Sequence, residues 1–124
     1  MTKRIVIVDD NPVIRRLLRN ILESADGSWV VCAEAGDGRE GAQKIQESKP
    51  DVAVLDLTMP VMSGLEAARV LSETTPQTPL ILCTLHEDSV LKTEASAAGI
   101  SAVVSKAENM QVLVDTVRTL LEPV

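Results

Sequence analysis

The chain has 124 residues, and its 12 lysines and arginines against 18 aspartates and glutamates give a formal charge of −6. Hydrophobic residues make up 45% of it, although it has one tryptophan and no phenylalanine or tyrosine. This apolar content excludes a disordered chain and predicts one domain with an aliphatic core. The acidic balance argues against a nucleic-acid-binding surface, which favours positive charge.

Targeting signals and disulfides are also not expected. No apolar run approaches the roughly 20 residues that span a bilayer, and the run at residues 5–8 is too short for a secretory signal and is followed by Asp9. Cys32 and Cys83 stand in apolar surroundings without CxxC spacing, which predicts buried, reduced thiols. We therefore expect a cytoplasmic protein that does not associate with membranes.

The first half of the chain alternates β-branched runs with amphipathic segments. Residues 3–8 predict a strand, and Pro12 begins a helix at a position that tolerates proline. Residues 30–35 predict the second strand. Asp37, with a glutamate three positions later, predicts a capping box for a helix through about Ser48.

The same alternation continues to the end. Residues 51–55 predict a nearly all-apolar strand, as expected when both faces of a sheet are covered. Ser63, again with a glutamate three positions later, begins a helix to about Thr74. Five strands alternating with five helices predict a parallel, doubly wound α/β sheet with right-handed crossovers. The remaining elements are strands at 80–83 and 101–104 and helices at 88–98 and 109–121.

Polar residues follow four of the five predicted strands. In doubly wound folds, ligands bind beyond the carboxyl ends of the strands. Asp9 and Asp10 follow the first strand, Asp56 the third, Thr84 the fourth, and Lys106 stands just beyond the fifth. We therefore expect one pocket that holds three carboxylates, a hydroxyl and an ammonium group.

This combination of groups suggests a particular chemistry. Three adjacent carboxylates repel one another, and one lysine cannot neutralise them, so either they take up protons or a cation binds. Oxygen ligands fit Mg²⁺, and Mg²⁺ with lysine and threonine can hold phosphoryl oxygens. Aspartate is a competent phosphoryl acceptor. Each residue alone could be a turn former or a surface residue, but together they predict a Mg²⁺-dependent phosphoryl-accepting site.

At these positions the sequence resembles the receiver domain of two-component response regulators, over nearly its whole length. Four segments carry the resemblance in order, at residues 5–11, 56–64, 80–84 and 98–106. The resemblance implies a flavodoxin-like (βα)5 fold with strand order 2-1-3-4-5, and a single receiver domain at 1–124 with no effector domain in this chain. The loops look most like those of receivers attached to helix-turn-helix DNA-binding domains.

The resemblance also implies roles for the matching residues. Asp56 would be the phosphorylated nucleophile. Asp9 and Asp10 would bind Mg²⁺ or Mn²⁺ together with Asp56, and Thr58 would offer its backbone carbonyl to the metal. Lys106 would pair with the phosphoryl group.

The switch itself departs from the usual pattern of the family. Thr84 would move its hydroxyl onto the phosphoryl group and relay the signal to the surface of the fourth helix, fifth strand and fifth helix. Val103 stands where many receivers carry tyrosine or phenylalanine, so the aromatic part of the switch is missing. Thr58 and His86 would flank the water that hydrolyses the acyl phosphate and so tune its lifetime, although His86 is equally consistent with an exposed loop residue.

Expected partners follow from the same resemblance. The phosphodonor would be a histidine kinase or phosphotransfer protein, and DNA would be reached only through an effector domain. Receivers also form homodimers. The chain would catalyse only its own phosphorylation and dephosphorylation. Arg15, Arg16 and Arg19 form a basic cluster on the first helix, which either contacts the kinase or is a solvated face.

Two other functions fit the sequence less well. An aspartate-nucleophile phosphohydrolase typically has a second aspartate two positions after the first, whereas Thr58 follows Asp56 and Asn11 follows Asp9. A flavin- or nucleotide-binding module needs a Gly- or Ser/Thr-rich phosphate loop after the first strand. The acidic segment at 9–10 would repel a phosphate in the absence of metal.

Overall fold

Ten elements alternate along the part of the chain that the structure describes, and all of the predicted strands and helices are present. The computed structural model describes residues 2–85, 88–107 and 109–122. Each strand boundary lies within one residue of its prediction. The elements are β1 (Lys3–Val8), α1 (Pro12–Ala25), β2 (Trp29–Ala35), α2 (Gly38–Ser48), β3 (Val52–Asp56), α3 (Gly64–Thr74), β4 (Leu80–Thr84), α4 (Ser89–Ala97), β5 (Ala102–Ser105) and α5 (Met110–Leu121).

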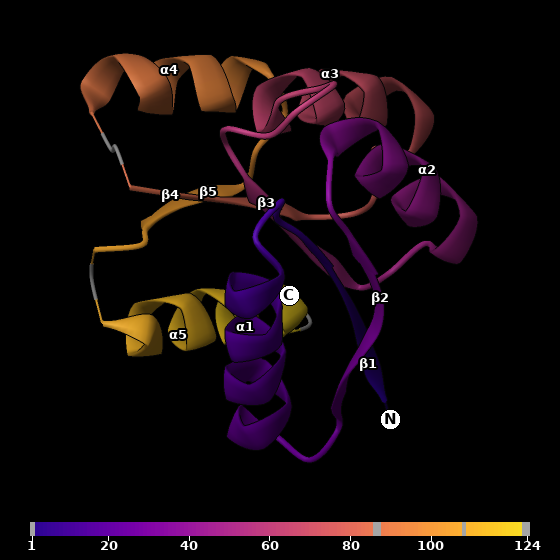
Figure 1. Cartoon of the computed structure of the whole chain (residues 1–124), viewed down its shortest axis with the longest axis vertical. Helices are drawn as coiled ribbons and strands as arrows, with labels where there is room; N and C mark the ends of the chain where they lie inside the picture. The colour runs from indigo at the N-terminus through magenta and orange to yellow at the C-terminus, as the bar shows by residue number, and fades with distance from the viewer. Residues whose placement is uncertain (1, 86–87, 108, 123–124) are drawn as a thin grey trace.

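The five strands form one parallel sheet in the order β2-β1-β3-β4-β5, which confirms the predicted fold. Helices α1 and α5 cover one face, and α2, α3 and α4 cover the other (Figure 1). The chain runs outward from β1 to β2 and then returns to the other side of β1 as β3. The switch point between β1 and β3 is where folds of this class bind ligands.

The core consists of two aliphatic layers separated by the sheet. Along β1, Val6 and Val8 pack toward α2, α3 and α4, whereas Ile5 and Ile7 pack toward α1 and α5. All four are at most 1% exposed. Because alternate side chains of a strand point to opposite faces, a central strand covered on both faces must be apolar throughout.

Local hydrogen bonds fix the helix starts. Ser63 and Glu66 form the complete predicted capping box at α3. At α2 only half of the predicted box is present, because Asp37 accepts from the Glu40 amide without a reciprocal bond. Asn11 caps α1 by accepting from two backbone amides, so neither aspartate before it is needed as the cap.

The prediction that both cysteines are buried is confirmed for one and wrong for the other. Cys83 is buried as expected, but Cys32 is exposed. Strand β2 lies at an edge of the sheet, and its pairing with β1 jumps from Val31 to Ala33, leaving Cys32 without a partner in the ladder. Trp29, at the start of the same strand, is only 6% exposed and so is more deeply buried than an edge position suggests.

No helix among the described residues has the length and apolar character needed to cross a membrane.

Candidate functional site

The carboxyl end of the sheet brings together acidic residues that lie far apart in the sequence. One carboxylate oxygen each from Asp9, Asp10 and Asp56 lies within 4.8 Å of the others. The Lys106 Nζ donates hydrogen bonds to Asp9 Oδ2 and to Asp56 Oδ1, both at 2.9 Å. The acidic site, as we call these four side chains, has the composition expected from the residues that follow β1, β3 and β5.

Asp9 is the anchored member of the acidic site. It is 2% exposed, and its backbone amide donates to the Ala35 carbonyl at 3.1 Å. Its Oδ1 accepts from the Asn11 amide at 2.9 Å, and its Oδ2 accepts from Lys106. Asp10, the next residue, is exposed to solvent. The pair therefore presents one rigid, buried carboxylate and one accessible carboxylate.

Asp56 is held by the close approach of α3. A Cβ on Gly64 would lie only 2.2 Å from the Asp56 carbonyl oxygen, so only glycine fits there. The Gly64 amide also donates to the Leu57 carbonyl at 2.9 Å. Thr58 lies in the loop that begins here and is exposed. The strand end and the first turn of α3 thus form one unit that fixes the position of the Asp56 side chain.

The ionisation of this site follows from burial and pairing. Burial raises the pKa of Asp56 above its usual value, and the hydrogen bond from Lys106 only partly opposes this. Burial by itself would lower the pKa of Lys106, but hydrogen bonds to Asp56 and Asp9, together with their charges, outweigh it and raise that pKa. Lys106 therefore stays protonated, and the formal charge of the acidic site is −2.

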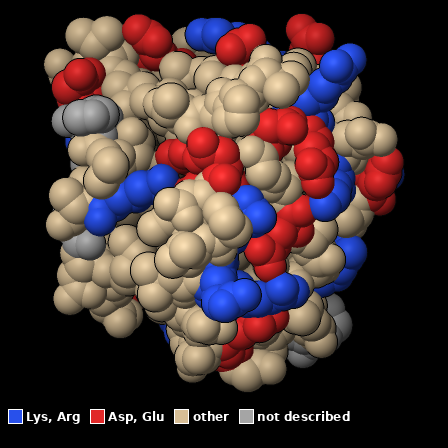
Figure 2. Space-filling view, viewed as in Figure 1, with Lys and Arg blue, Asp and Glu red and all other residues tan. Residues whose placement is uncertain are grey.

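Oxygen donors with this surplus charge fit a divalent cation. Asp9, Asp10 and Asp56 could each offer one oxygen, and the accessible Asp10 leaves room for the water ligands that Mg²⁺ retains. On the face of the molecule shown in Figure 2, acidic and basic side chains are interspersed. The donor set therefore suits a hard dication such as Mg²⁺ better than a thiol- or imidazole-binding metal.

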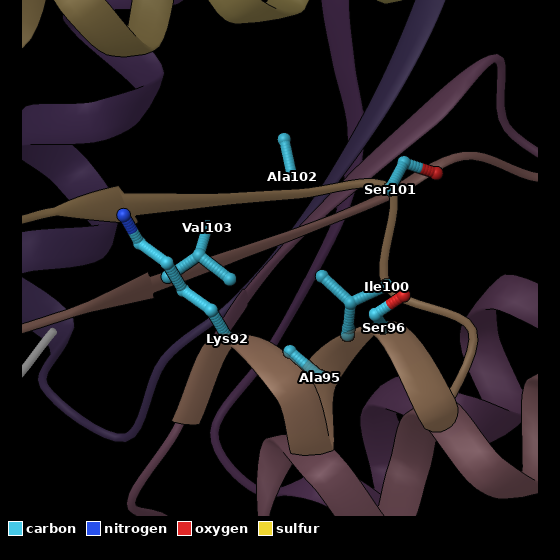
Figure 3. A pocket seen from close by; sticks show the side chains of 7 residues that line it. All are labelled: Lys92, Ala95, Ser96, Ile100, Ser101, Ala102 and Val103. Carbon is cyan, nitrogen blue, oxygen red and sulfur yellow. The ribbon is translucent and has the colours of Figure 1, made fainter. Parts of the chain in front are cut away.

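The two predicted switch positions lie in different surroundings. Thr84 is the last residue of β4 and is 3% exposed, and its carbonyl accepts from the Lys106 amide at 2.7 Å. Val103 does not line the acidic site. It faces α4 and lines a cavity of about 220 Å³ between α4 and β5, where the Lys92 stem runs beside it (Figure 3). His86, predicted to tune the phosphoryl lifetime, lies outside the described residues.

The arginine cluster on α1 is only partly a solvated face. Arg15 and Arg19 both pair with Glu34 on β2, at 3.4 and 2.6 Å, whereas Arg16 is exposed. With 3.6 residues per turn, Arg15 lies beside the apolar Leu18 on the helix surface and Arg16 lies opposite it, so this spacing could have shown that Arg15 borders the packed face. The particular contacts of Arg15 with Glu34 and Asp9 could not be predicted from the sequence.

Fold and site together define a doubly wound α/β domain with an acidic, lysine-bridged site at its switch point. Residues 5–118 match the family model of the response regulator receiver domain. The chain belongs to this family. Receiver domains are signalling switches of two-component systems, and they interact with histidine kinases or phosphotransfer proteins.

Individual relatives agree with this assignment. The chemotaxis protein CheY of Thermotoga maritima is 36% identical over 99 residues, which cover 80% of this chain and 81% of that protein. A protein-glutamate methylesterase/protein-glutamine glutaminase of Hahella chejuensis is 41% identical over 84% of this chain, which spans only 30% of that protein. The crystal structure of a LuxR-family response regulator from an Aurantimonas species superimposes with a TM-score of 0.92 at 33% identity, covering 98% of this chain and 86% of that one.

Proposed function

We propose that this chain is a phosphorylation-dependent switch that accepts a phosphoryl group on Asp56 from a histidine kinase or phosphotransfer protein. The observation that carries the proposal is the Lys106 ammonium, which lies 2.9 Å from an oxygen of Asp56 and of Asp9 within a cluster of three carboxylates. The formal charge of the acidic site, Lys106 included, is −2, so a merely structural role would leave the carboxylates repelling one another.

The proposed reaction transfers a phosphoryl group between a nitrogen and an oxygen. A carboxylate oxygen of Asp56 attacks the phosphorus of the partner's phosphohistidine. The new O–P bond forms as the P–N bond breaks, and the imidazole nitrogen keeps the electron pair and takes up a proton. Lys106, already within hydrogen-bond distance of Asp56, stabilises negative charge on the transferred group.

A divalent cation completes this scheme. Asp9, Asp10 and Asp56 would hold Mg²⁺ or Mn²⁺, with the Thr58 backbone carbonyl as a further ligand, and the bound ion would neutralise charge on phosphoryl oxygens. The accessible position of Thr58 beside Asp56 also supports a role of its side chain, with His86, in setting the lifetime of the acyl phosphate.

The signal would leave the site through β4 and β5. Thr84 is proposed to move its hydroxyl onto a phosphoryl oxygen, and its backbone bond to Lys106 supports a coupled movement of the two strand ends. Val103, packed against α4, would pass the movement to the surface formed by α4, β5 and α5. We expect that surface to act on an effector domain or partner, or in a homodimer, with DNA reached only through such an effector. We expect residues 1–124 to form one receiver domain in the cytoplasm.

Intact mass spectrometry tests this proposal. The chain is incubated with Mg²⁺ and acetyl phosphate, and separately with a phosphorylated histidine kinase. We expect a single phosphate adduct that requires the metal and is absent in Asp56→Asn. The matched control is Asp115→Asn, which changes an exposed aspartate of α5 and should keep the adduct. An adduct that persists in Asp56→Asn, or no adduct with any donor, would contradict the proposal.

A further inference from the structure

The side chain of Arg15 links the acidic site to the edge of the sheet. Its Nη1 donates to the backbone carbonyl of Asp9 at 2.7 Å, and its Nε lies 3.4 Å from Glu34 Oε1. The side chain is only 22% exposed. A planar guanidinium carries donors on separate nitrogens that point in different directions, so Arg15 can make both contacts at once in a fixed geometry.

The carbonyl that Arg15 contacts belongs to the peptide unit between Asp9 and Asp10. Because a peptide unit is planar, the direction of this carbonyl also sets where the Asp10 backbone begins. The Asp9 amide and both of its carboxylate oxygens are already held by Ala35, Asn11 and Lys106. The Asp9 carbonyl is the remaining polar group, and Arg15 holds it.

Glu34 in turn holds Arg15 in place. Its Oε1 faces the Arg15 Nε, and its Oε2 accepts from Arg19 Nη1 at 2.6 Å. Glu34 lies on β2 and is 24% exposed, so this pairing lies against the sheet rather than in open solvent. Arg16 differs sharply, because its side chain makes no hydrogen bond or ion pair with any residue that the structure describes.

From these contacts we infer that Arg15 is a positioning residue for the proposed metal site. It holds the Asp9–Asp10 peptide so that the exposed Asp10 carboxylate stays within the acidic cluster, and Glu34 orients Arg15 for this purpose. The inference deepens the proposed function, on which it rests, and assigns the role to Arg15 rather than to its equally charged neighbour.

The direction in which the Mg²⁺ affinity changes when Arg15 is replaced distinguishes a positioning role from a purely electrostatic one. Removing a positive charge near a cation site should by Coulomb's law strengthen cation binding. Losing a residue that orients a ligand should weaken it, and changes in such outer-shell partners typically cost about 10- to 100-fold in metal affinity.

Titration calorimetry with MgCl₂ alone tests this inference. We expect Mg²⁺ to bind Arg15→Met about tenfold more weakly than the wild type, whereas the matched control Arg16→Met should bind it equally well or slightly better. Glu34→Gln should weaken binding less than Arg15→Met does. In the Arg15→Met background, Glu34→Gln should have no further effect on Mg²⁺ binding, because Arg15, through which Glu34 acts on the site, is gone.

A second measurement needs no metal. In EDTA, hydrogen exchange of the Asp10 and Asn11 amides should be faster in Arg15→Met than in the wild type and unchanged in Arg16→Met, at equal thermal stability of the rest of the domain. Equal Mg²⁺ affinity and equal exchange in all three proteins would overturn the inference while leaving phosphorylation of Asp56 intact. No saturable Mg²⁺ binding to the wild type would overturn it together with the metal part of the proposed function.

Discussion

The two ends of the parallel sheet handle charge in opposite ways. At the amino end of β2, the Asp26 carboxylate accepts hydrogen bonds from the Ser28 amide and hydroxyl and from Arg118. The Arg118 guanidinium in turn lies 4.8 Å from the centre of the Trp29 ring. At the carboxyl end, three carboxylates lie together, and Lys106 pairs with two of them, Asp9 and Asp56. One end is balanced, and the other carries a surplus of negative charge.

The aspartates at the two ends report this difference directly. Hydrogen bonds from Ser28, assisted by Arg118, lower the pKa of Asp26 to about 2. Burial raises the pKa of Asp56 despite its bond to Lys106. The same residue type thus favours its charged form at one end and resists it at the other. Titratable groups held in such an unfavourable arrangement cluster at functional sites, which supports the proposed role of the acidic site.

Removing the shared ammonium should produce the largest effect. In Lys106→Met, the buried carboxylate of Asp9 and the partly buried carboxylate of Asp56 would lose their counter-charge, and loss of one partner of a buried pair costs about 3 kcal/mol. We expect the free energy of unfolding of the metal-free protein to fall by about that amount in urea titrations followed by Trp29 fluorescence.

Mg²⁺ provides the control for this variant. A dication at the carboxylates should replace the missing charge, so Mg²⁺ should recover more stability in Lys106→Met than in the wild type. A loss of much less than 1 kcal/mol in EDTA, or no extra gain with Mg²⁺, would mean that the acidic site is not strained by its charge.

The same Asp→Asn substitution should change the folding stability in opposite directions at the two ends of the sheet. In EDTA near neutral pH, Asp56→Asn should raise the free energy of unfolding by about 1 kcal/mol, because it removes a charge from a crowded, buried site. Asp26→Asn should lower the melting temperature, because it removes a carboxylate that the native state prefers ionised. Melting curves of the two variants and the wild type provide the measurement.

The pH dependence of these differences follows from the two pKa shifts. The stabilising contribution of Asp26 is complete above its unfolded value of 3.8 and is lost as the pH falls toward about 2. For Asp56, whose native pKa is raised, the penalty is absent below 3.8 and grows as the pH rises through the native value. The advantage of Asp56→Asn should therefore disappear below 3.8, and the disadvantage of Asp26→Asn should disappear only near 2. An advantage of Asp56→Asn that persists at acid pH would contradict this account.

The contrast also explains which parts of the site could be predicted from the sequence. The end of a strand can be predicted where an apolar run is followed by polar residues. In a parallel sheet, these ends lie at the same edge. Asp9, Asp56 and Lys106 could therefore be predicted to meet although up to 97 positions separate them. No knowledge of side-chain packing was needed for that step.

Other features depend on rotations and registers that no local pattern encodes. Which acceptors Arg15 reaches depends on how α1 is placed against β2 and the end of β1. The exposure of Cys32 accompanies a shift of pairing between Ile5 and Val6 in the ladder of β1 with β2. Both features are set by tertiary packing, which the local sequence pattern does not determine.

The smallest expected effect lies at the balanced end of the sheet. Arg118→Met would remove both the contact with the Trp29 ring and the pair with Asp26, but the Arg118 side chain is 44% exposed, so solvent screens both interactions. We expect a small drop in melting temperature and a red shift of the Trp29 emission, because the Trp29 ring becomes more accessible to water. Arg69→Met, at an exposed arginine of α3, is the control and should change neither value.

The emission shift matters because it localises the loss of stability. A stability change without an emission shift would place the effect away from Trp29. If Arg118→Met lowered the stability as much as Lys106→Met does, each end of the sheet would depend equally on one cation. The surplus negative charge of the acidic site would then have no measurable effect on folding stability.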